Sequence, residues 1–265
     1  MPYFEGARGR LHYRRWSFAR PAATLVLLPG TGQHSGHYHR FARALAPAGI
    51  ELWTLDTSGH GLSEGDPERP GTLPELAADA LTFVALVPSP PPLFLMGHSL
   101  GAATALAAII ADPTPPCTGL ILCGTPKAVL AGQPPKSARG TAATAPGGFG
   151  PAAARSGGSV AGTRPQPSAI HGDASNPARG ESISTAPGRG VEGGREPVLP
   201  EGIPVLCVHG VDDRRTPVGP VREWAGRVAA GFREYENAGH DLLHEPVQAE
   251  VTADIAEWIR AVAGR

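Results

Sequence analysis

A glycine-flanked serine between a predicted strand and a predicted helix constrains this chain more than any other feature. The run Gly97-His98-Ser99-Leu100-Gly101 follows the apolar stretch 92–96 and precedes the small-residue stretch 102–108. A serine at the apex of such a turn has a strained backbone, so the positions two before and two after it must be nearly free of side chain. Glycine fills both positions. The pattern predicts a nucleophilic Ser99 at a helix N-terminus, which favours a developing oxyanion.

The alternative is a tight turn in a non-catalytic protein, because a chain with 35 glycines can match the pattern by chance. The rest of the chain supports the first interpretation, since strand-like and helix-like segments alternate. This rhythm predicts the α/β class, with a mostly parallel central sheet and helices on both faces. We expect an antiparallel strand at 9–16, further strands at 24–28, 50–55, 92–96, 120–123, 204–209 and 232–236, and helices at 73–87, 102–108, 217–230 and 246–263. Thr216 is expected to cap the helix at 217–230, with Pro217 in its first turn.

Residues 131–198 break the alternation. They contain no leucine and a single Phe, Tyr or Trp residue, Phe149, among many Gly, Ala, Pro, Ser and Arg. Such a segment buries too little apolar surface to offset its conformational entropy, so we expect it to be disordered. The predicted organisation is a core of residues 1–130 and 199–265 around this low-complexity segment.

Two origins fit this composition. The segment is either a native insert or a stretch translated out of frame, because shifted frames of GC-rich genes are rich in Gly, Ala, Pro, Arg and Ser. We favour the second origin. The predominance of arginine over lysine likewise suggests a GC-rich bacterial gene.

Composition excludes several function classes. The formal net charge of -1 argues against nucleic acid or an anionic membrane as a partner. No apolar run is long enough to span a membrane, so we expect a soluble protein without a transmembrane segment. The three cysteines have no metal-like spacing, and the N-terminus does not read as a signal peptide. The expected compartment is the cytoplasm.

A nucleophilic serine needs a base, an orienting acid and oxyanion donors. Asp212 and Asp213 follow the predicted strand 204–209, and both are candidates for the acid. His240 and His244 follow the last predicted strand, and His240 is favoured because the small residues before it let its loop reach across the strand ends. A zinc site at His34, His37 and His39 is the competing use of histidine. We do not favour it, because no structural ligand spacing accompanies these residues.

Three motifs carry a family resemblance. Residues 34–38 read H-S-G-H-Y, residues 56–61 read D-T-S-G-H-G, and residues 240–245 read H-D-L-L-H-E. They are similar to the H-S-x-R-Y, D-x-x-G-H-G and H-E-L-L-N-E runs of serine hydrolases related to monoacylglycerol lipase and bacterial lysophospholipases, often described as serine aminopeptidase-like. The departures are His37, Asp241 and His244. The resemblance covers residues 24–126 and 203–263.

The resemblance implies an α/β-hydrolase fold and a Ser-His-Asp triad. The family's acid lies three residues after a glycine and four before a proline, so Gly210 and Pro217 select Asp213, and Asp212 is expected to cap the turn. The backbone N–H groups of Thr31 and Leu100 would form the oxyanion hole. Pro29-Gly30 replaces the family's usual H-G in the oxyanion loop, which leaves a backbone donor intact.

The resemblance also implies an activity: hydrolysis of monoacylglycerol-like, lysophospholipid-like or small carboxylic esters through an acyl-enzyme, without a metal or cofactor. An acyl-thioesterase with the same triad and a catalytically silent scaffold are the alternatives. In the family, the segment corresponding to 131–198 is a helical cap with an apolar inner face. Here its chemistry is wrong for a cap, so we expect an open site with little preference for long acyl chains.

Overall fold

Eight strands form a single sheet in a computed structural model that describes residues 1–88, 91–112, 117–132 and 196–264. All of these residues belong to one compact unit, residues 1–140 and 187–265. A second unit, residues 141–186, lies outside the described residues, as does most of the predicted low-complexity segment. Within the described part of the chain, no helix has the length and apolar character needed to cross a membrane.

The sheet has the order β1-β2-β4-β3-β5-β6-β7-β8. β1 and β2 pair antiparallel, β2 joins β4 antiparallel, and every other pair is parallel. This arrangement confirms the predicted α/β class and the antiparallel strand at 9–16. The strands are β1 (Tyr3–Gly6), β2 (Gly9–Trp16), β3 (Ala23–Leu28), β4 (Ile50–Leu55), β5 (Leu93–His98), β6 (Gly119–Cys123), β7 (Val205–Gly210) and β8 (Gly231–Tyr235).

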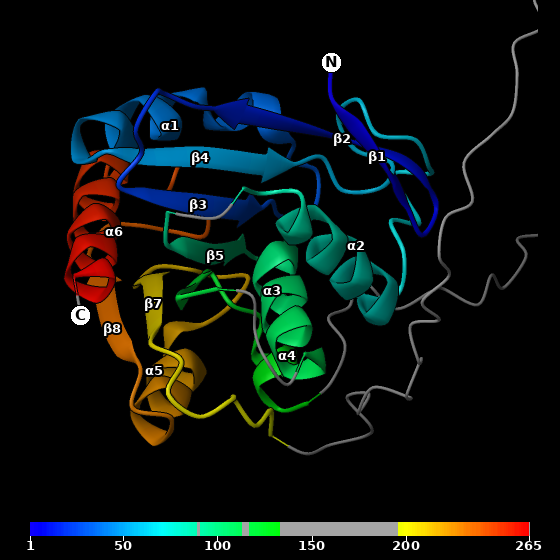
Figure 1. Cartoon of the computed structure of the whole chain (residues 1–265). Coiled ribbons are helices and arrows are strands. Elements are labelled where there is room, and N and C mark those ends of the chain that lie inside the picture. The colour runs from blue at the N-terminus through cyan, green and yellow to red at the C-terminus, as the bar shows by residue number, and fades with distance from the viewer. Residues whose placement is uncertain (89–90, 113–116, 133–195, 265) are drawn as a thin grey trace, which may run out of the picture. The chain divides into compact units, whose positions relative to one another are not determined.

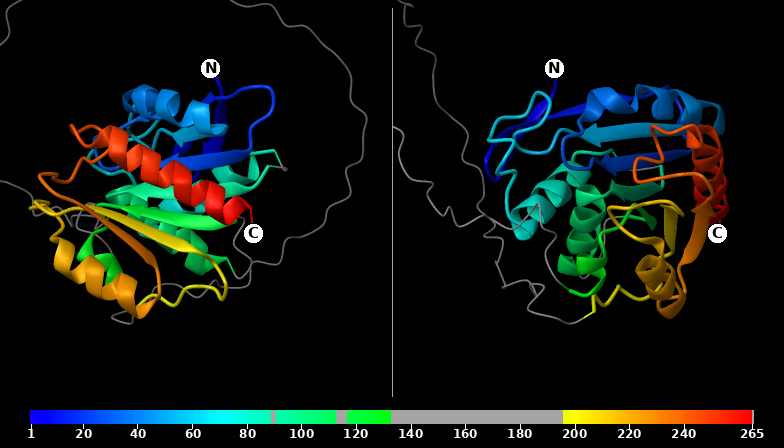
Figure 2. Two further views of the ribbon diagram at one scale, coloured as in Figure 1. Left: turned by 90° about the vertical axis from the view of Figure 1, so that its left-hand side faces the viewer. Right: turned by 180° about the vertical axis from the view of Figure 1, so that it is seen from behind.

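Helices cover both faces of this sheet (Figures 1 and 2). α1 and α6 lie on one face, and α2, α3 and α5 lie on the other. The helices are η1 (Ser35–Tyr38), α1 (His39–Leu45), η2 (Ala46–Ala48), α2 (Leu73–Ala85), α3 (Leu100–Ala111), α4 (Lys127–Leu130), α5 (Val218–Arg227) and α6 (Gln248–Ala263).

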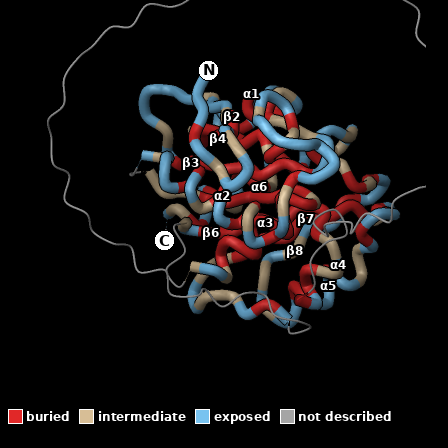
Figure 3. Tube along the Cα trace, turned by 90° about the vertical axis from the view of Figure 1, so that its right-hand side faces the viewer, coloured by how far each residue is buried: buried red, intermediate tan, exposed pale blue. Residues whose placement is uncertain are grey.

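Alternating side chains of the central strands build two hydrophobic clusters. In β3, Leu25 and Leu27 contribute to the cluster under α1 and α6, whereas Val26 and Leu28 contribute to the cluster under α2 and α3. Successive side chains of a strand point to opposite faces, so a strand buried on both sides reads as a continuous apolar run. The buried strands form the centre of the molecule in Figure 3, with exposed segments around them.

Local sequence signals explain where α2 begins, and they misplace the start of α5. Thr72 and Glu75 form a reciprocal capping box at the start of α2. The expectation that Thr216 caps α5 was wrong, because the N-cap is Pro217 and it makes no side-chain hydrogen bond. The Thr216 hydroxyl donates instead to Asp213 Oδ2 at 2.6 Å.

The parallel register brings the carboxyl ends of the central strands to one edge. Leu28 pairs with Gly97, and His98 pairs with Cys123. The loops after β3, β5, β7 and β8 therefore start at the same edge of the sheet, although they lie far apart in the sequence.

Candidate active site

Ser99 connects β5 to α3 with a strained backbone. Its φ of 53° and ψ of -111° make it one of three described non-glycine residues with positive φ. Such a conformation costs free energy and persists only where the surrounding structure imposes it. The Ser99 N–H donates to the Cys123 carbonyl at 2.9 Å, which ties the turn to β6. The predicted strand, sharp turn and helix around the serine are thus confirmed.

The backbone around Ser99 is packed so closely that only glycine fits at positions 97 and 101. A Cβ on Gly97 would overlap the Gly101 carbonyl, and a Cβ on Gly101 would overlap the Leu28 carbonyl at the end of β3. α3 therefore begins closer to the sheet than any side chain would permit. This close approach aims the N-terminus of α3 at Ser99.

The loop after β3 passes beside Ser99. A Cβ added to Gly30 would lie 3.2 Å from the Ser99 Cβ, and Thr31 is the next residue of this loop. Leu100 is the first residue of α3, where the helix supplies no acceptor for the backbone N–H. Leu100 directly follows Ser99, and Thr31 directly follows Gly30, the loop residue that approaches Ser99; their role as oxyanion donors stays a prediction.

Asp213 and His240 are in direct contact. Asp213 Oδ2 lies 2.7 Å from His240 Nδ1, and the two residues are only 4% and 8% exposed. Asp213 Oδ1 accepts the N–H groups of Arg215 at 2.8 Å and Thr216 at 2.9 Å. The carboxylate is therefore both held in place and oriented toward the imidazole.

These hydrogen bonds keep Asp213 ionised. Burial alone would raise its pKa, but hydrogen bonds from His209, His240 and Thr216 outweigh burial and hold the pKa of Asp213 well below its ordinary range. His209 lies in β7, with Nε2 at 2.6 Å from the Thr216 carbonyl and 3.4 Å from Asp213 Oδ2. Neither the approach of His209 to Asp213 nor the bond from Thr216 to Asp213 was predicted from the sequence.

Asp212 does not cap the turn, contrary to expectation. It is exposed, and its backbone N–H donates to the Ala238 carbonyl at 2.9 Å. The turn is instead capped by Asp213, whose carboxylate accepts the N–H groups two and three residues later. The same side chain can do both because its second oxygen, Oδ2, remains available for His240.

His98 links the serine turn to the His240 loop. Its Nε2 donates to the His240 carbonyl at 2.9 Å, and the two rings are 5.1 Å apart. Burial lowers the pKa of His98 to about 4, so its ring is neutral near pH 7. Among the described residues, no hydrogen bond joins the Ser99 hydroxyl to His240. Catalytic contacts of this kind are often long before substrate binds.

His34 and His37 lie close to each other and to His244 of the loop that follows β8. His34 and His37 have ring centroids 4.0 Å apart, and His37 lies 6.3 Å from His244. No group of three or more possible ligands that could hold a metal occurs among the described residues. Burial lowers the pKa of His37 and of His244, which opposes the charged form of both rings.

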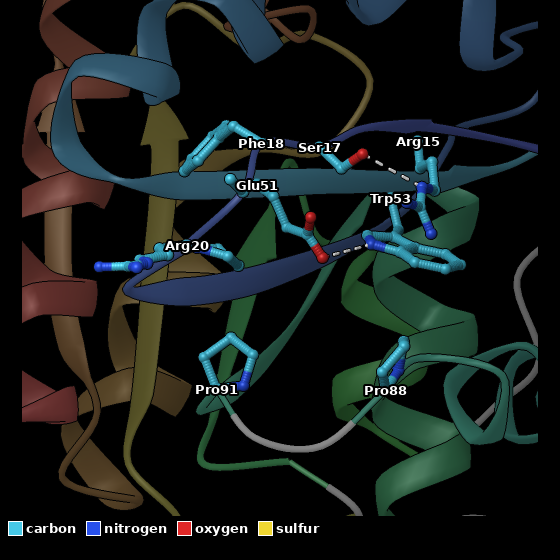
Figure 4. Close-up of a pocket in the computed structure, with 10 residues that line it drawn as sticks. Arg15, Ser17, Phe18, Arg20, Glu51, Trp53, Pro88 and Pro91 are labelled. Atoms are coloured by element: carbon cyan, nitrogen blue, oxygen red, sulfur yellow. Dashed lines mark hydrogen bonds between the residues drawn. The ribbon is translucent and has the colours of Figure 1, made fainter.

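A hollow of about 500 Å³ lies at the other edge of the sheet. It is lined by loop residues 17–21, by Glu51 and Trp53 of β4, and by Pro88 and Pro91 (Figure 4). Glu51 accepts the Trp53 indole N–H at 2.7 Å. Because these residues lie toward the amino ends of the strands, the hollow is remote from Ser99 and is not part of the candidate site.

Residues 19–161 match the family described as serine aminopeptidase S33. The chain belongs to this family. A monoacylglycerol lipase of Mycolicibacterium smegmatis is 29% identical, over 97% of this chain and 95% of that protein. Human monoglyceride lipase is 33% identical, over 40% of this chain and 37% of that protein. The enzyme class expected from the sequence, a carboxylic ester hydrolase, is confirmed by the family match and these relatives.

Solved structures support the fold. The structure of Est1E from Butyrivibrio proteoclasticus with bound ferulic acid has a TM-score of 0.66 and 16% identity, and the match covers 100% of both chains. A monoacylglycerol lipase of Paleococcus ferrophilus has a TM-score of 0.61 and 18% identity, over 95% of this chain and 99% of that chain. At these identities the likeness concerns the fold alone, and it confirms the expected α/β-hydrolase fold.

Proposed function

We propose that this family member cleaves monoacylglycerol-like esters through a triad of Ser99, His240 and Asp213. The observation that carries the proposal is the 2.7 Å contact between Asp213 Oδ2 and His240 Nδ1, in loops that follow β7 and β8. The strained Ser99 at the end of β5 supports its role as nucleophile, because the turn exposes its hydroxyl at the same edge.

The proposed acylation step uses His240 as both base and acid. With Nδ1–H donating to Asp213, the Nε2 atom is unprotonated and can accept the Ser99 hydroxyl proton. Ser99 Oγ then attacks the ester carbonyl carbon, and the N–H groups of Thr31 and Leu100 stabilise the negative oxygen. The carbon–oxygen bond to the alcohol breaks, His240 returns the proton to the departing oxygen, and an acyl-Ser99 ester remains.

Deacylation repeats these steps with water. A water molecule attacks the acyl carbon while His240 takes its proton, and the proton then returns to the Ser99 oxygen as the carboxylic acid leaves. The net reaction converts ester and water into acid and alcohol. Asp213 stays ionised throughout, in accord with its lowered pKa.

The proposed substrate class rests on the relatives. The Mycolicibacterium smegmatis protein, matched over 95% of its length, is a monoacylglycerol lipase. An acyl-thioesterase would use the same residues, so a panel of matched glycerol esters and thioesters distinguishes the two activities. We expect the glycerol esters to be hydrolysed with the higher kcat/KM.

The triad is tested by labelling the purified protein with a fluorophosphonate probe. We expect Ser99→Ala to remove labelling, His240→Ala to slow it strongly, and Asp213→Asn to slow it by about 10²–10⁴-fold, as for other Ser-His-Asp triads. Asp212→Asn is the matched control, because Asp212 is adjacent and exposed. It should label at the wild-type rate.

Two outcomes would contradict the proposal. One is labelling that does not require Ser99, and the other is a folded wild-type protein, verified by circular dichroism, that does not label. The second outcome would favour the silent scaffold.

A further inference from the structure

One carboxylate holds the main chain on both sides of His240. The Gly239 N–H donates to Glu245 Oε2 at 2.6 Å, and the Asp241 N–H donates to Glu245 Oε1 at 2.9 Å. The two oxygens of Glu245 therefore bind the main-chain N–H groups of the residues directly before and directly after His240. Hydrogen bonds to an ionised acceptor are roughly twice as strong as neutral ones.

Neighbouring contacts complete this support. The carbonyl of His240 accepts from His98 Nε2 at 2.9 Å, so three successive main-chain groups around the base are hydrogen-bonded. A Cβ on Gly239 would lie only 3.1 Å from Glu245 Oε1, and a Cβ on Gly210 would overlap the Gly239 carbonyl. Small residues at both positions allow the carboxylate and the acid loop to approach this backbone.

The position of the imidazole depends on that backbone. In the proposed mechanism Nδ1 faces Asp213 while Nε2 serves Ser99, so a movement of the His240 main chain displaces both contacts together. A misplacement of about 1 Å can cost about 10²-fold in rate. Glu245 itself makes its hydrogen bonds to the main chain and not to the imidazole.

We propose that Glu245 is a positioning residue for His240, which it holds in place through the N–H groups of Gly239 and Asp241. This inference rests on the proposed function, because it takes His240 as the catalytic base. Glu245 acts through His240 and stays outside the set of groups that touch substrate.

Two substitutions at Glu245 separate the effect of its second acceptor oxygen from the effect of its side-chain length. Glu245→Gln keeps the size of the side chain, but its amide NH₂ would face an N–H donor, so only one of the two hydrogen bonds survives. Glu245→Asp keeps the charge and is one methylene shorter, so it cannot reach both N–H groups. Glu75→Gln is the matched control, since Glu75 Oε2 accepts the N–H and hydroxyl of Thr72 at 2.7 and 2.8 Å in α2.

The experiment measures kcat and KM for a glycerol ester and a p-nitrophenyl ester with the same acyl group. The nitrophenolate leaves without a proton, whereas the glycerol alkoxide needs one from His240. We expect Glu245→Gln to lower kcat/KM, which reports acylation, about 30–100-fold for the glycerol ester but only about 3–10-fold for the nitrophenyl ester, with KM for the glycerol ester nearly unchanged. Glu75→Gln should leave both rates at the wild-type level.

An unchanged kcat/KM for the glycerol ester in Glu245→Gln overturns the proposal, and so does an equal loss of kcat/KM on both esters that tracks a lower melting temperature. If Glu245→Gln does not fold, Glu245→Asp must show the same dependence on the leaving group. Failure of the proposed function is seen separately, because fluorophosphonate labelling of the wild type would then not require Ser99 and His240.

Discussion

At the scale of single residues, the Asp213 carboxylate is the most fully hydrogen-bonded group of the site. It accepts one N–H at Arg215, one N–H and the hydroxyl at Thr216, and the ring N–H of His240. Together with the His209 ring, whose Nε2 lies 3.4 Å from Oδ2, these donors hold the carboxylate in one orientation. His240, the base of the proposed triad, requires an orienting carboxylate that is held rigidly in this way.

Thr216→Val tests the hydroxyl contribution at constant shape. Loss of the 2.6 Å bond to Asp213 Oδ2 should reduce the free energy of unfolding by about 1–3 kcal/mol and kcat/KM by about tenfold. Urea unfolding and ester hydrolysis measure these effects. Thr82→Val is the control, because the exposed Thr82 hydroxyl bonds only a carbonyl in its own helix. Equal effects of the two substitutions would contradict the expectation.

Because His98 is buried, we expect the free energy of unfolding to fall in acid. Its folded pKa of about 4 lies below the unfolded value of about 6.5, so the unfolded chain binds the proton first as pH falls. Stability from this group is complete above pH ~6.5 and declines as pH falls toward 4, by about 2 kcal/mol between pH 7 and 5. In His98→Gln that decline should be smaller by this amount, measured by urea unfolding at both pH values. Exposed His39→Gln should retain the wild-type decline.

At the scale of elements, the junction of β5 and α3 depends on two glycines. Gly101→Ala should displace the start of α3 from the Leu28 carbonyl, destabilise the fold by more than about 2 kcal/mol and remove fluorophosphonate labelling. Gly226→Ala in α5 meets no atom within 4 Å and should be neutral or stabilise by about 0.5–1 kcal/mol. Thermal melts and labelling of both variants check this contrast. A fully labelled Gly101→Ala would refute the close-approach argument.

Elements with a continuous apolar run or an amphipathic repeat were predictable, and the shortest strand was not. The strands β3 to β7 are continuous buried runs, and α2 and α6 carry the repeat of about 3.6 residues of an amphipathic helix. β1 has four residues and was missed, because Phe4 alone marks its buried face. α5 begins one residue later than expected because Thr216 bonds Asp213, a contact the local sequence does not encode.

At the scale of the whole molecule, the motif residues were predicted from the sequence, but the residues that hold them in place were not. The structure brings Asp213 and His240 together as expected. The contact of His98 with the His240 carbonyl joins residues 142 positions apart, and no local pattern indicates it. Glu245 was named only as part of the H-D-L-L-H-E run, because a carboxylate that accepts backbone N–H groups leaves no periodic trace.

The composition of residues 131–198 leads to a prediction about substrate range. A segment without leucine and with Phe149 as its single Phe, Tyr or Trp residue offers few side chains for an apolar acyl pocket. We therefore expect kcat/KM to change little from C4 to C12 esters of one alcohol, measured in a single series. A steep rise with chain length would show that this segment, or another apolar surface, binds the acyl chain.

The strand order has a consequence for how the protein acquires reactivity. Ser99, Asp213 and His240 follow β5, β7 and β8, and Thr31 follows β3, so the parallel pairings that join these strands must all form before the four residues meet. Pairings between distant segments form slowly during folding. During refolding, fluorophosphonate reactivity should therefore return only with the last kinetic phase, and partly folded chains should be inert.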